Sequence, residues 1–554
     1  MSTEIHTPSR SAFDAAGFTE TIRFLVDRTK SLYLSDQIPW VIGYSGGKDS
    51  TAILQLVWYA MQELHAEGKA NKPVHVISTD TLVENPIVAM WVGRSLEQMR
   101  QAVAEQHLNI IPHRLTPEVK DRFWVNLIGR GYPAPRYKFR WCTDRLKISP
   151  SNNFIKTVVK NNGEAILVLG TRKAESATRA ATMESYENRE DNTRSAVGLT
   201  VNKQLDRVWI YTPIADWSND DVWQYLMQVK NPWGFKNQEL LGMYQGATAD
   251  GECPLVVDKS TPSCGDSRFG CYVCTMVGED KSMAAMIQND TEKEWMLPLL
   301  QLRNEIDIND SNKERKGEKI EADKERRDFR RMNGSLTVHI NEYGADLVRG
   351  PYRQPFREHM LKKVLEAQKI VQEIGPDEVR NLELLSLEDL EAIRHIWLED
   401  KHEVEDSVPH IYERTLGKKY PGIKRSHHSL LNSNIMEKLR NKCSTYNDPD
   451  GLIYEQIRTL ISIEDKHSNM LRRANLYKEL DTSLQTMAFN NIKEARDFAL
   501  NRKLNENKIK ILQPNLPKQD KEQLLWENEK LQLALTNNSH FLEDEQIDIE
   551  ELPA

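Results

Sequence analysis

The sequence predicts an α/β fold with a parallel sheet, followed by a cysteine-rich module and a mainly helical C-terminal region. Short β-branched runs alternate with helical patterns over residues 1–235, as they do in parallel α/β sheets. Four of the six cysteines lie between positions 253 and 274, and helical patterns fill most of 336–510. These changes of pattern set the expected domain boundaries.

Five apolar runs have the length and β-branched content of buried strands. They read "WVIGYS", "PVHVISTD", "LNIIPHRL", "EAILVLGT" and "VWIYTPI". Several are continuous enough to be covered on both faces, which is typical of parallel strands. Polar motifs stand at the ends of these runs, where the ligand sites of α/β sheets form.

The expected domains follow the composition along the chain. Residues 1–235 form the α/β domain, 236–300 the cysteine-rich module, 301–335 a charged linker, 336–510 the helical region and 511–554 a flexible acidic tail. The linker carries charges of both signs, a pattern found in solvated helices and in mobile segments.

The composition argues against two classes of protein. No apolar run reaches about 18 residues, so no membrane partner is expected. The N-terminus "MSTEIHTPSRSAF" lacks the basic start and apolar core of a signal peptide, which predicts a cytoplasmic protein. The net charge of -8 is unlike that of a protein that coats nucleic acid, so any contact with DNA must come from a local basic patch.

A glycine-rich turn lies between the first expected strand and a helix. Its residues are Ser45, Gly46, Gly47, Lys48, Asp49 and Ser50. The unpaired N–H groups of a helix N-terminus bind anions, and glycines let the backbone approach a phosphate closely. Lys48 supplies a positive charge and the two serines supply hydroxyl donors. Asp49 cannot bind phosphate directly, but it could cap the helix or hold Mg²⁺.

Two common phosphate loops do not fit this turn. A Walker A loop needs four residues between its first glycine and a Gly-Lys-Ser/Thr, and a dinucleotide fingerprint needs separated glycines. The turn resembles instead the pyrophosphate loop of the N-type ATP pyrophosphatases and the phosphoadenylyl-sulfate (PAPS) reductases. That resemblance implies a Rossmann-like sheet of the adenine nucleotide α-hydrolase (PP-loop) type, with the turn holding the pyrophosphate of ATP.

Two further segments agree with this resemblance. "VISTDTLVENP" (76–86) ends a strand at Asp80, where the superfamily contacts the nucleoside, although a simple strand-end cap would look the same. "GTRKAESATRA" (170–180) resembles another superfamily element, which implies that Arg172, Lys173 and Arg179 bind the polyphosphate as charge-assisted donors.

The cysteines suggest a metal site. Cys253, Cys264, Cys271 and Cys274 have the spacing C-x10-C-x6-C-x2-C, which suits an iron–sulfur cluster or zinc. The absence of two symmetric CxxC knuckles favours the cluster. Cys142 stands apart among arginines and lysines, which lower the pKa of a thiol, so it is a reactive thiol, a cluster ligand or an inert buried cysteine.

The combination of SGGKDS, "WCTDRLK" (141–147), the late cysteines and the long helical half resembles one family, DndC. These are the PAPS reductase-like proteins of bacterial DNA phosphorothioation systems. The resemblance implies ATP pyrophosphatase activity with ATP and Mg²⁺, and a [4Fe–4S] cluster on Cys253, Cys264, Cys271 and Cys274. It also implies three kinds of partner: a cysteine desulfurase, other phosphorothioation subunits and DNA.

In such a reaction ATP would activate a non-bridging phosphate oxygen, and sulfur would then displace AMP. Lys48 and Arg172 would offset charge on the polyphosphate. The candidate catalytic residues are Lys48, Asp49 and Cys142. Cys142 could carry a persulfide or replace Cys253 as a ligand. Three rival functions stay open: a sulfonucleotide (PAPS/APS) reductase, a tRNA-thiolation-type ATP pyrophosphatase, and a non-catalytic interaction subunit.

Overall fold

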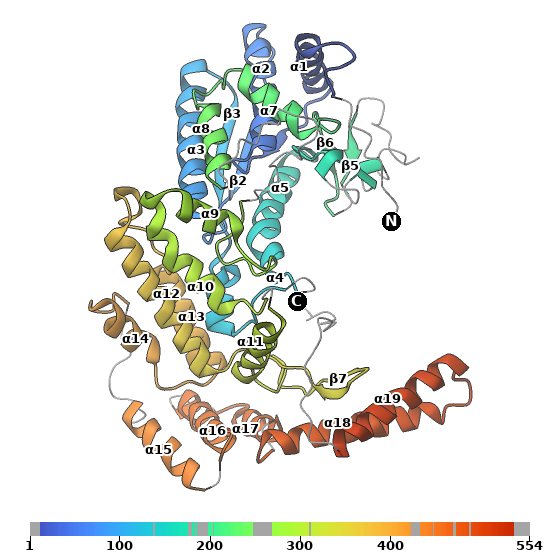
Figure 1. Ribbon diagram of the computed structural model, residues 1–554, viewed down its shortest axis with the longest axis vertical. Coiled ribbons are helices and arrows are strands. Elements are labelled where there is room, and N and C mark those ends of the chain that lie inside the picture. Colours follow the sequence, from blue (N-terminus) through green and yellow to red (C-terminus); the bar gives the residue numbers. More distant parts are fainter. Residues whose placement is uncertain are drawn as a thin grey trace. The chain divides into compact units, whose positions relative to one another are not determined.

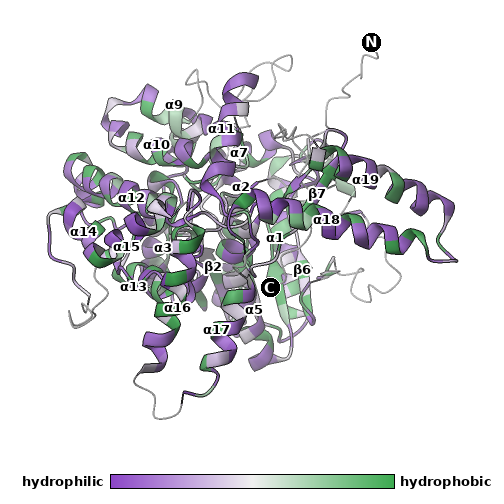
Figure 2. Ribbon diagram, turned by 90° about the horizontal axis from the view of Figure 1, so that it is seen from below, coloured by the Kyte–Doolittle hydropathy of each residue, from purple (hydrophilic) through white to green (hydrophobic). Residues whose placement is uncertain are grey.

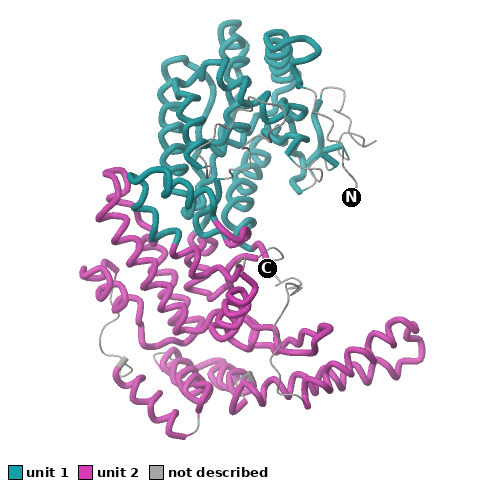
Figure 3. Tube along the Cα trace, viewed as in Figure 1, with its two compact units in different colours: residues 1–118, 141–274, 280–300 teal, residues 119–140, 275–279, 301–554 magenta. Residues whose placement is uncertain are grey.

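The computed structural model divides into two compact units (Figure 3). It describes residues 11–136, 139–175, 180–181, 183–184, 198–202, 204–247, 269–309, 312–422, 433–446, 448–468, 473–486 and 489–536. Unit 1 comprises Met1–Glu118, Trp141–Cys274 and Asp280–Leu300; unit 2 comprises Val119–Arg140, Thr275–Glu279 and Gln301–Ala554. The chain therefore passes between the units several times.

Unit 1 contains a six-stranded sheet with the order β3-β2-β1-β4-β6-β5 (Figure 1). The strands are β1 (Trp40–Gly43), β2 (Val74–Thr79), β3 (Ile110–Leu115), β4 (Ala165–Val168), β5 (Thr200–Val201) and β6 (Val208–Tyr211). All pairs are parallel except β5 with β6, and Trp40 lies opposite both Val74 and Ile166. The predicted mostly parallel α/β sheet is confirmed, and the five predicted runs form every strand of it except β5.

The strand residues alternate between two apolar cores, because successive side chains point to opposite faces of a sheet. Trp40 and Ile42 belong to a core formed with α1, α2, α3 and α7, whereas Val41 belongs to a second core that includes Ile155 and Val158. The sheet is thus covered on both faces, which explains the continuous apolar runs of the sequence.

Helices α3 and α7 of unit 1 begin at side-chain caps. At the start of α3, Asn85 accepts a hydrogen bond from the Ile87 N–H, and Pro86 is the first helical residue. At the start of α7, Ser218 forms a capping box with Asp221. The elements are α1 (Phe18–Leu34), α2 (Lys48–Ala66), α3 (Pro86–Gln106), α4 (Trp141–Thr143), η3 (Asp144–Ile148), α5 (Ser149–Asn162), η4 (Lys173–Glu175), α7 (Asn219–Gln228), α8 (Asn237–Gly246), α9 (Lys281–Asn289) and η6 (Thr291–Met296). Helix α10 (Leu297–Ile306) begins in unit 1 and ends in unit 2.

Unit 2 is mainly helical and includes one two-stranded hairpin. Its elements are η1 (Val119–Asp121), η2 (Val125–Arg130), α11 (Lys313–Arg326), β7 (Val338–Asn341), β8 (Gly344–Leu347), α12 (Gln354–Ile374), η7 (Asp377–Val379), α13 (Leu387–His395), η8 (Ile396–Asp400), α14 (Ser407–Leu416), α15 (Ser433–Thr445), α16 (Leu452–Ser468), α17 (Leu476–Thr486), α18 (Ile492–Ile511) and α19 (Lys518–Thr536). Figure 2 shows that α18 and α19 are mostly hydrophilic. Among the helices of the described residues, none combines the length and apolarity needed to cross a bilayer.

The units differ from the expected domains in three places. Residues 119–140 belong to unit 2, although the sequence suggests one domain over 1–235. The expected linker, 301–335, contains α11, and its Asp323 is buried and bonded to the Tyr352 hydroxyl at 2.9 Å. The expected flexible tail, 511–554, contains α19, because Leu531 and Ala534 pack into an apolar cluster with α18 and β8.

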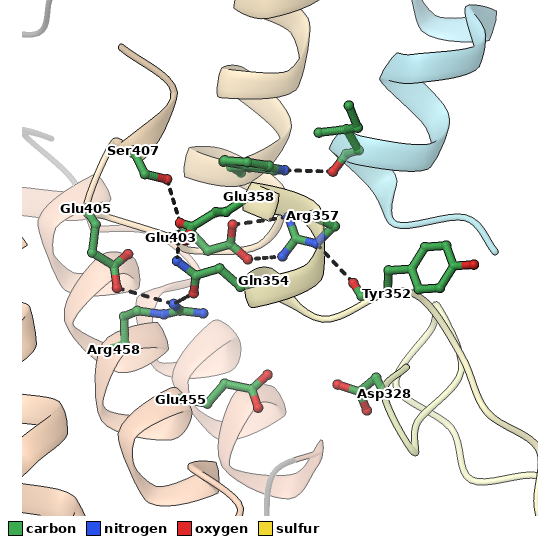
Figure 4. A network of polar contacts seen from close by, with 12 residues as sticks. Asp328, Tyr352, Gln354, Arg357, Glu358, Glu403, Glu405, Ser407, Glu455 and Arg458 are labelled. Atoms are coloured by element: carbon green, nitrogen blue, oxygen red, sulfur yellow. Dashed lines mark hydrogen bonds and ion pairs between the residues drawn. The ribbon is translucent and has the colours of Figure 1, made fainter. Parts of the chain in front are cut away.

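A buried ion pair holds the helices of unit 2 together (Figure 4). Arg357 of α12 forms a two-pronged pair with Glu403, with one N–O distance of 3.2 Å, and donates to the Tyr352 carbonyl at 3.0 Å. Its guanidinium also lies 5.2 Å from the ring centre of Trp397. Both charges are almost fully buried, so each depends on the other for its solvation.

We expect Glu403→Gln to lower the free energy of unfolding by about 3–5 kcal/mol, since it leaves the Arg357 charge buried without a counter-charge. Urea unfolding followed by tryptophan fluorescence measures the change. Glu388→Gln is the matched control, because Glu388 pairs with Arg122 at 2.9 Å while largely exposed, and such pairs contribute about 0–1 kcal/mol. Equal losses in the two variants would contradict the prediction.

Candidate functional site

The glycine-rich turn lies at the point where the sheet reverses its strand order. From β1 the chain proceeds to β2 and β3 on one side, and β4 and β6 lie on the other side. Ligands of open α/β sheets bind at such a switch point, beyond the carboxyl ends of the strands. The turn 44–47 follows β1 there, and Gly170 follows β4.

The backbone of the turn can be built only with glycine at its centre. Gly46 has a φ of +76°, and a Cβ there would lie 2.5 Å from Cγ2 of Val92. The Trp91 indole N–H donates to the Gly46 carbonyl at 3.1 Å and holds the turn from α3. Gly170 also has no room for a side chain, since a Cβ there would lie 2.9 Å from the Asp49 carbonyl. The two loops are therefore in backbone contact.

Donors of the turn gather at the start of α2. The Ser45 and Ser50 hydroxyls lie 3.1 Å apart, and Ser50 donates to the Gly47 carbonyl at 3.0 Å. The Gly47 N–H approaches the Ser45 hydroxyl at 3.5 Å and the Lys48 N–H approaches the Tyr244 hydroxyl at 3.5 Å. These are long contacts for N–H donors, so an anion with better geometry could take their place.

Lys48 is held beside the turn by its surroundings. Its ammonium lies 3.6 Å from Asp49 and 5.4 Å from the ring centre of Tyr244. Burial raises the pKa of Tyr244 to about 12, so its phenol stays protonated near neutral pH and can donate a hydrogen bond. The sequence offers no motif for Tyr244, which reaches the turn from α8.

Asp49 and Arg172 form an ion pair across the switch point. The Arg172 Nε donates to Asp49 at 2.7 Å, and another of its nitrogens donates to the Trp217 carbonyl at 3.2 Å. Arg172 is 4% exposed. The N-cap residue of α2 is Gly47, so Asp49 lies in the first turn of the helix and is not its cap. Arg172, expected to bind the polyphosphate, thus holds two loops together, while Asp49, expected as a helix cap or Mg²⁺ ligand, accepts from it.

The other predicted nucleotide-binding residues lie at the same edge of the sheet or outside the described residues. Lys173 pairs with Asp216 at 3.1 Å. Arg179 lies outside the described residues. Asp80 ends β2, where it accepts from the Leu82 N–H at 2.8 Å and from the Arg114 Nε at 3.1 Å. Those contacts are the ones a strand-end cap makes, and the nucleoside contact stays a prediction.

Three of the candidate cysteines gather beyond the end of β2. Cys271 contacts the Thr81 hydroxyl at 3.4 Å, and the Cys274 N–H donates to the Cys271 carbonyl at 3.0 Å. The Cys142 thiol interacts electrostatically with both, and Lys147 interacts with all three. Cys142 therefore belongs with the late cysteines, although it is far from them in sequence.

The environment of Cys142 and Cys271 opposes the ionisation of their thiols. Burial raises the pKa of Cys271 to about 11, against the influence of Lys147, and burial and Cys274 raise the pKa of Cys142. Burial also raises the pKa of nearby Glu84 to about 7. Burial thus favours the protonated thiol at Cys142 and Cys271, and metal binding would release their protons. Glu84 lies within the segment 76–86, in which the sequence points to other residues. Only its burial in the fold reveals its raised pKa.

The cysteine cluster fits an iron–sulfur group in its chemistry, since thiolates are its usual ligands. Cys253 and Cys264 lie outside the described residues. Within the described ranges, no group of three or more His, Cys, Asp and Glu side chains forms a ready metal site. The cluster stays a prediction, with Cys142 added beside Cys271 and Cys274.

Comparisons with known proteins agree with the sheet and the turn. The family profile of the phosphoadenosine phosphosulfate reductase domain matches residues 39–236, which include the turn and all strands of unit 1. An uncharacterized protein of Methanocaldococcus jannaschii is 28% identical over 206 residues, which is 37% of this chain and 34% of that protein. The chain thus matches about a third of the length of this relative.

A solved structure also aligns with part of the chain. It is Candida glabrata FMN adenylyltransferase in complex with FAD and inorganic pyrophosphate, 12% identical, with a TM-score of 0.25, and the match covers 45% of this chain and 72% of that one. From the family profile and the sheet, the chain carries a phosphoadenosine phosphosulfate reductase-like domain on the mostly parallel α/β sheet of unit 1.

Proposed function

We propose that this chain is an ATP pyrophosphatase that activates a non-bridging phosphate oxygen of DNA for replacement by sulfur. The observation that carries the proposal is the SGGKDS turn, with Gly46 at positive φ between a parallel strand and the N-terminus of α2. Lys48 and the first N–H groups of α2 are donors that an anion such as pyrophosphate could use. The reductase-like domain supports a nucleotide ligand, and the resemblance to DndC suggests the DNA substrate.

In the first step, the phosphate oxygen attacks the α-phosphorus of ATP. The bond to the β-phosphate oxygen breaks, and pyrophosphate leaves with its electron pair. Lys48 and the amides of Gly47 and the first turn of α2 lie where they would offset the charge that builds on it. Mg²⁺ would share this task, and Asp49 is the nearest carboxylate to Lys48 in the turn.

In the second step, a sulfur nucleophile attacks the activated DNA phosphorus, and AMP leaves with the oxygen. The sulfur comes from a cysteine desulfurase as a persulfide. A second thiol must then cleave the S–S bond, and it forms a disulfide with the thiol that carried the sulfur. The thiols of Cys142, Cys271 and Cys274 lie beyond β2, the strand next to the one that precedes the turn. Other phosphorothioation subunits would present the DNA.

An iron–sulfur cluster, when bound to Cys142, Cys271, Cys274 and one of the two remaining late cysteines, would supply sulfur or electrons. Lys147 would offset part of the negative charge of such thiolates, since it interacts with all three described cysteines.

A second candidate is a sulfonucleotide reductase, which the name of the matching domain favours. The same turn would then hold a phosphate of the sulfonucleotide rather than the pyrophosphate of ATP. The two functions differ in their products. Release of pyrophosphate from ATP supports the first, and release of sulfite from a sulfonucleotide supports the second.

We expect Lys48→Met to reduce pyrophosphate release from ATP by about 100-fold or more, because an electrostatic donor to the leaving group is typically worth 2.7–4 kcal/mol. A coupled pyrophosphate assay on anaerobically purified protein measures it. Lys156→Met, at an exposed site on α5, is the control and should keep full activity. Unchanged activity in Lys48→Met would contradict the assignment of the turn.

Arg172→Gln should lower the free energy of unfolding by about 1–3 kcal/mol, because a buried charged hydrogen bond to Asp49 is lost. Chemical denaturation provides the measurement. Arg100→Gln removes an exposed pair with Glu97 and should cost less than about 1 kcal/mol. If the two losses are alike, Arg172 does not hold the loops together.

Cys142→Ser should lose most of its iron after anaerobic reconstitution, since Cys142 lies with Cys271 and Cys274. Iron and acid-labile sulfide per chain are the readouts, and they do not depend on activity. Cys443→Ser is the matched control, because Cys443 lies in an apolar cluster with Met436 and Tyr454 in unit 2. Full iron content with loss of sulfur transfer would instead make Cys142 a persulfide carrier.

A further inference from the structure

Unit 2 contains a charged cavity that the proposed function does not use. Its volume is about 710 Å³, within the range of small-molecule sites. It lies between the 328–334 turn, the start of α12, residues 400–403 and the 440–459 segment. Seven cationic and six anionic side chains line it among the residues that the structure describes.

Most of these charges neutralise one another or cap the backbone. Arg330 binds Asp328 at 2.9 Å and Glu455 at 2.7 Å, and Arg357 binds Glu403 (Figure 4). Two further carboxylates accept backbone N–H groups instead. These are Asp448, which accepts from Ile453 and Tyr454, and Asp450, which accepts from Ile492.

Four cations on the wall form no hydrogen bond or ion pair with a carboxylate in the described part of the chain, although Asp328 attracts Arg353 and Lys401 electrostatically. They are Arg331, Arg353, Lys401 and Arg440. Arg331 and Arg353 contact only backbone carbonyls, at 3.5 Å and 2.8 Å, and Arg440 lies 4.8 Å from the ring centre of Tyr454. Among the described residues, the wall therefore has cationic donors that are not hydrogen-bonded to carboxylates.

Lys401 is the most constrained of the four. Its ammonium makes no hydrogen bond or ion pair within the described residues. Burial, and then Arg357, lower its pKa to about 8, against the opposing charges of Glu403, Asp328 and Asp400. An anion beside it would stabilise its positive charge and offset the cost of burial.

The backbone next to Lys401 is strained. His402 has a φ of +55°, in the left-handed region that a residue with a side chain rarely adopts. Its ring accepts or donates a hydrogen bond with Ser462 at 3.0 Å, which holds this conformation. Strain of this kind persists where the surrounding structure requires it, and it is common at ligand sites.

We propose that this cavity binds a small phosphate-bearing ligand of the size of pyrophosphate or a mononucleotide, through Lys401, Arg331, Arg353 and Arg440. Guanidinium groups match the oxygens of a phosphate, and an ammonium adds a point charge. Four unsatisfied cations suit a ligand with two or more negative charges. The site is separate from the SGGKDS turn, which lies in unit 1.

The test is isothermal titration of the full chain carrying Lys48→Met, which weakens anion binding at the turn. Pyrophosphate and AMP are the probes, and a single-stranded oligonucleotide is titrated in parallel. We expect one binding event with pyrophosphate or AMP. Adding Lys401→Met should weaken it by about tenfold or more, and the same change at Lys369, exposed on α12 outside the cavity, should not alter it.

Arg440→Gln provides a second variant, because Arg440 is exposed and its loss should not disturb folding. It should also weaken binding, with an unchanged circular dichroism spectrum. Absence of binding by both small probes overturns the proposal, and so does equal affinity with and without Lys401. Binding of the oligonucleotide alone, lost in both variants, also overturns it and makes the cavity part of a nucleic-acid surface.

Discussion

The candidate site of unit 1 depends on the ion pair between Asp49 and Arg172. It joins the loop after β1 to the loop after β4, the two strands between which the sheet reverses its order. The missing side chain at Gly170 lets these loops come into backbone contact, and Gly46 lets the turn fold beneath Trp91. An anion at the start of α2 would therefore meet donors that are already in place, so little ordering would accompany its binding.

Local patterns of the sequence were sufficient to predict the sheet. Continuous β-branched runs mark strands that two apolar layers cover, and the glycine-rich turn marks the first strand–helix junction. The side-chain partners could not be predicted in the same way. Arg172 reads as a phosphate donor in a basic motif, but its partner is Asp49, 123 positions away. Tyr244 reaches the turn from a helix without a motif, and only the packing of α8 brings it there.

The position of Cys142 also could not be predicted from the sequence. The spacing of the late cysteines suggested one cluster, and Cys142 stood apart because sequence distance separates it from them. The fold places Cys142 beside Cys271 and Cys274, since residues 141–148 and 269–274 both lie beyond the end of β2. The charged segment shows a related limit. A run such as 313–326 looks solvated, yet one buried carboxylate, Asp323, is enough to anchor it to Tyr352.

The passage of the chain between the units has a consequence for its fragments. Residues 119–140 interrupt the α/β sequence, and they pack within unit 2. Within this insertion the segment 123–128 is strongly apolar, with Phe123, Val125, Leu127 and Ile128 buried. A fragment that ends after the sheet would contain this insertion without the rest of unit 2. Its apolar surface would then be exposed and prone to aggregation. Because the units are interleaved along the chain, a single cut cannot separate one from the other.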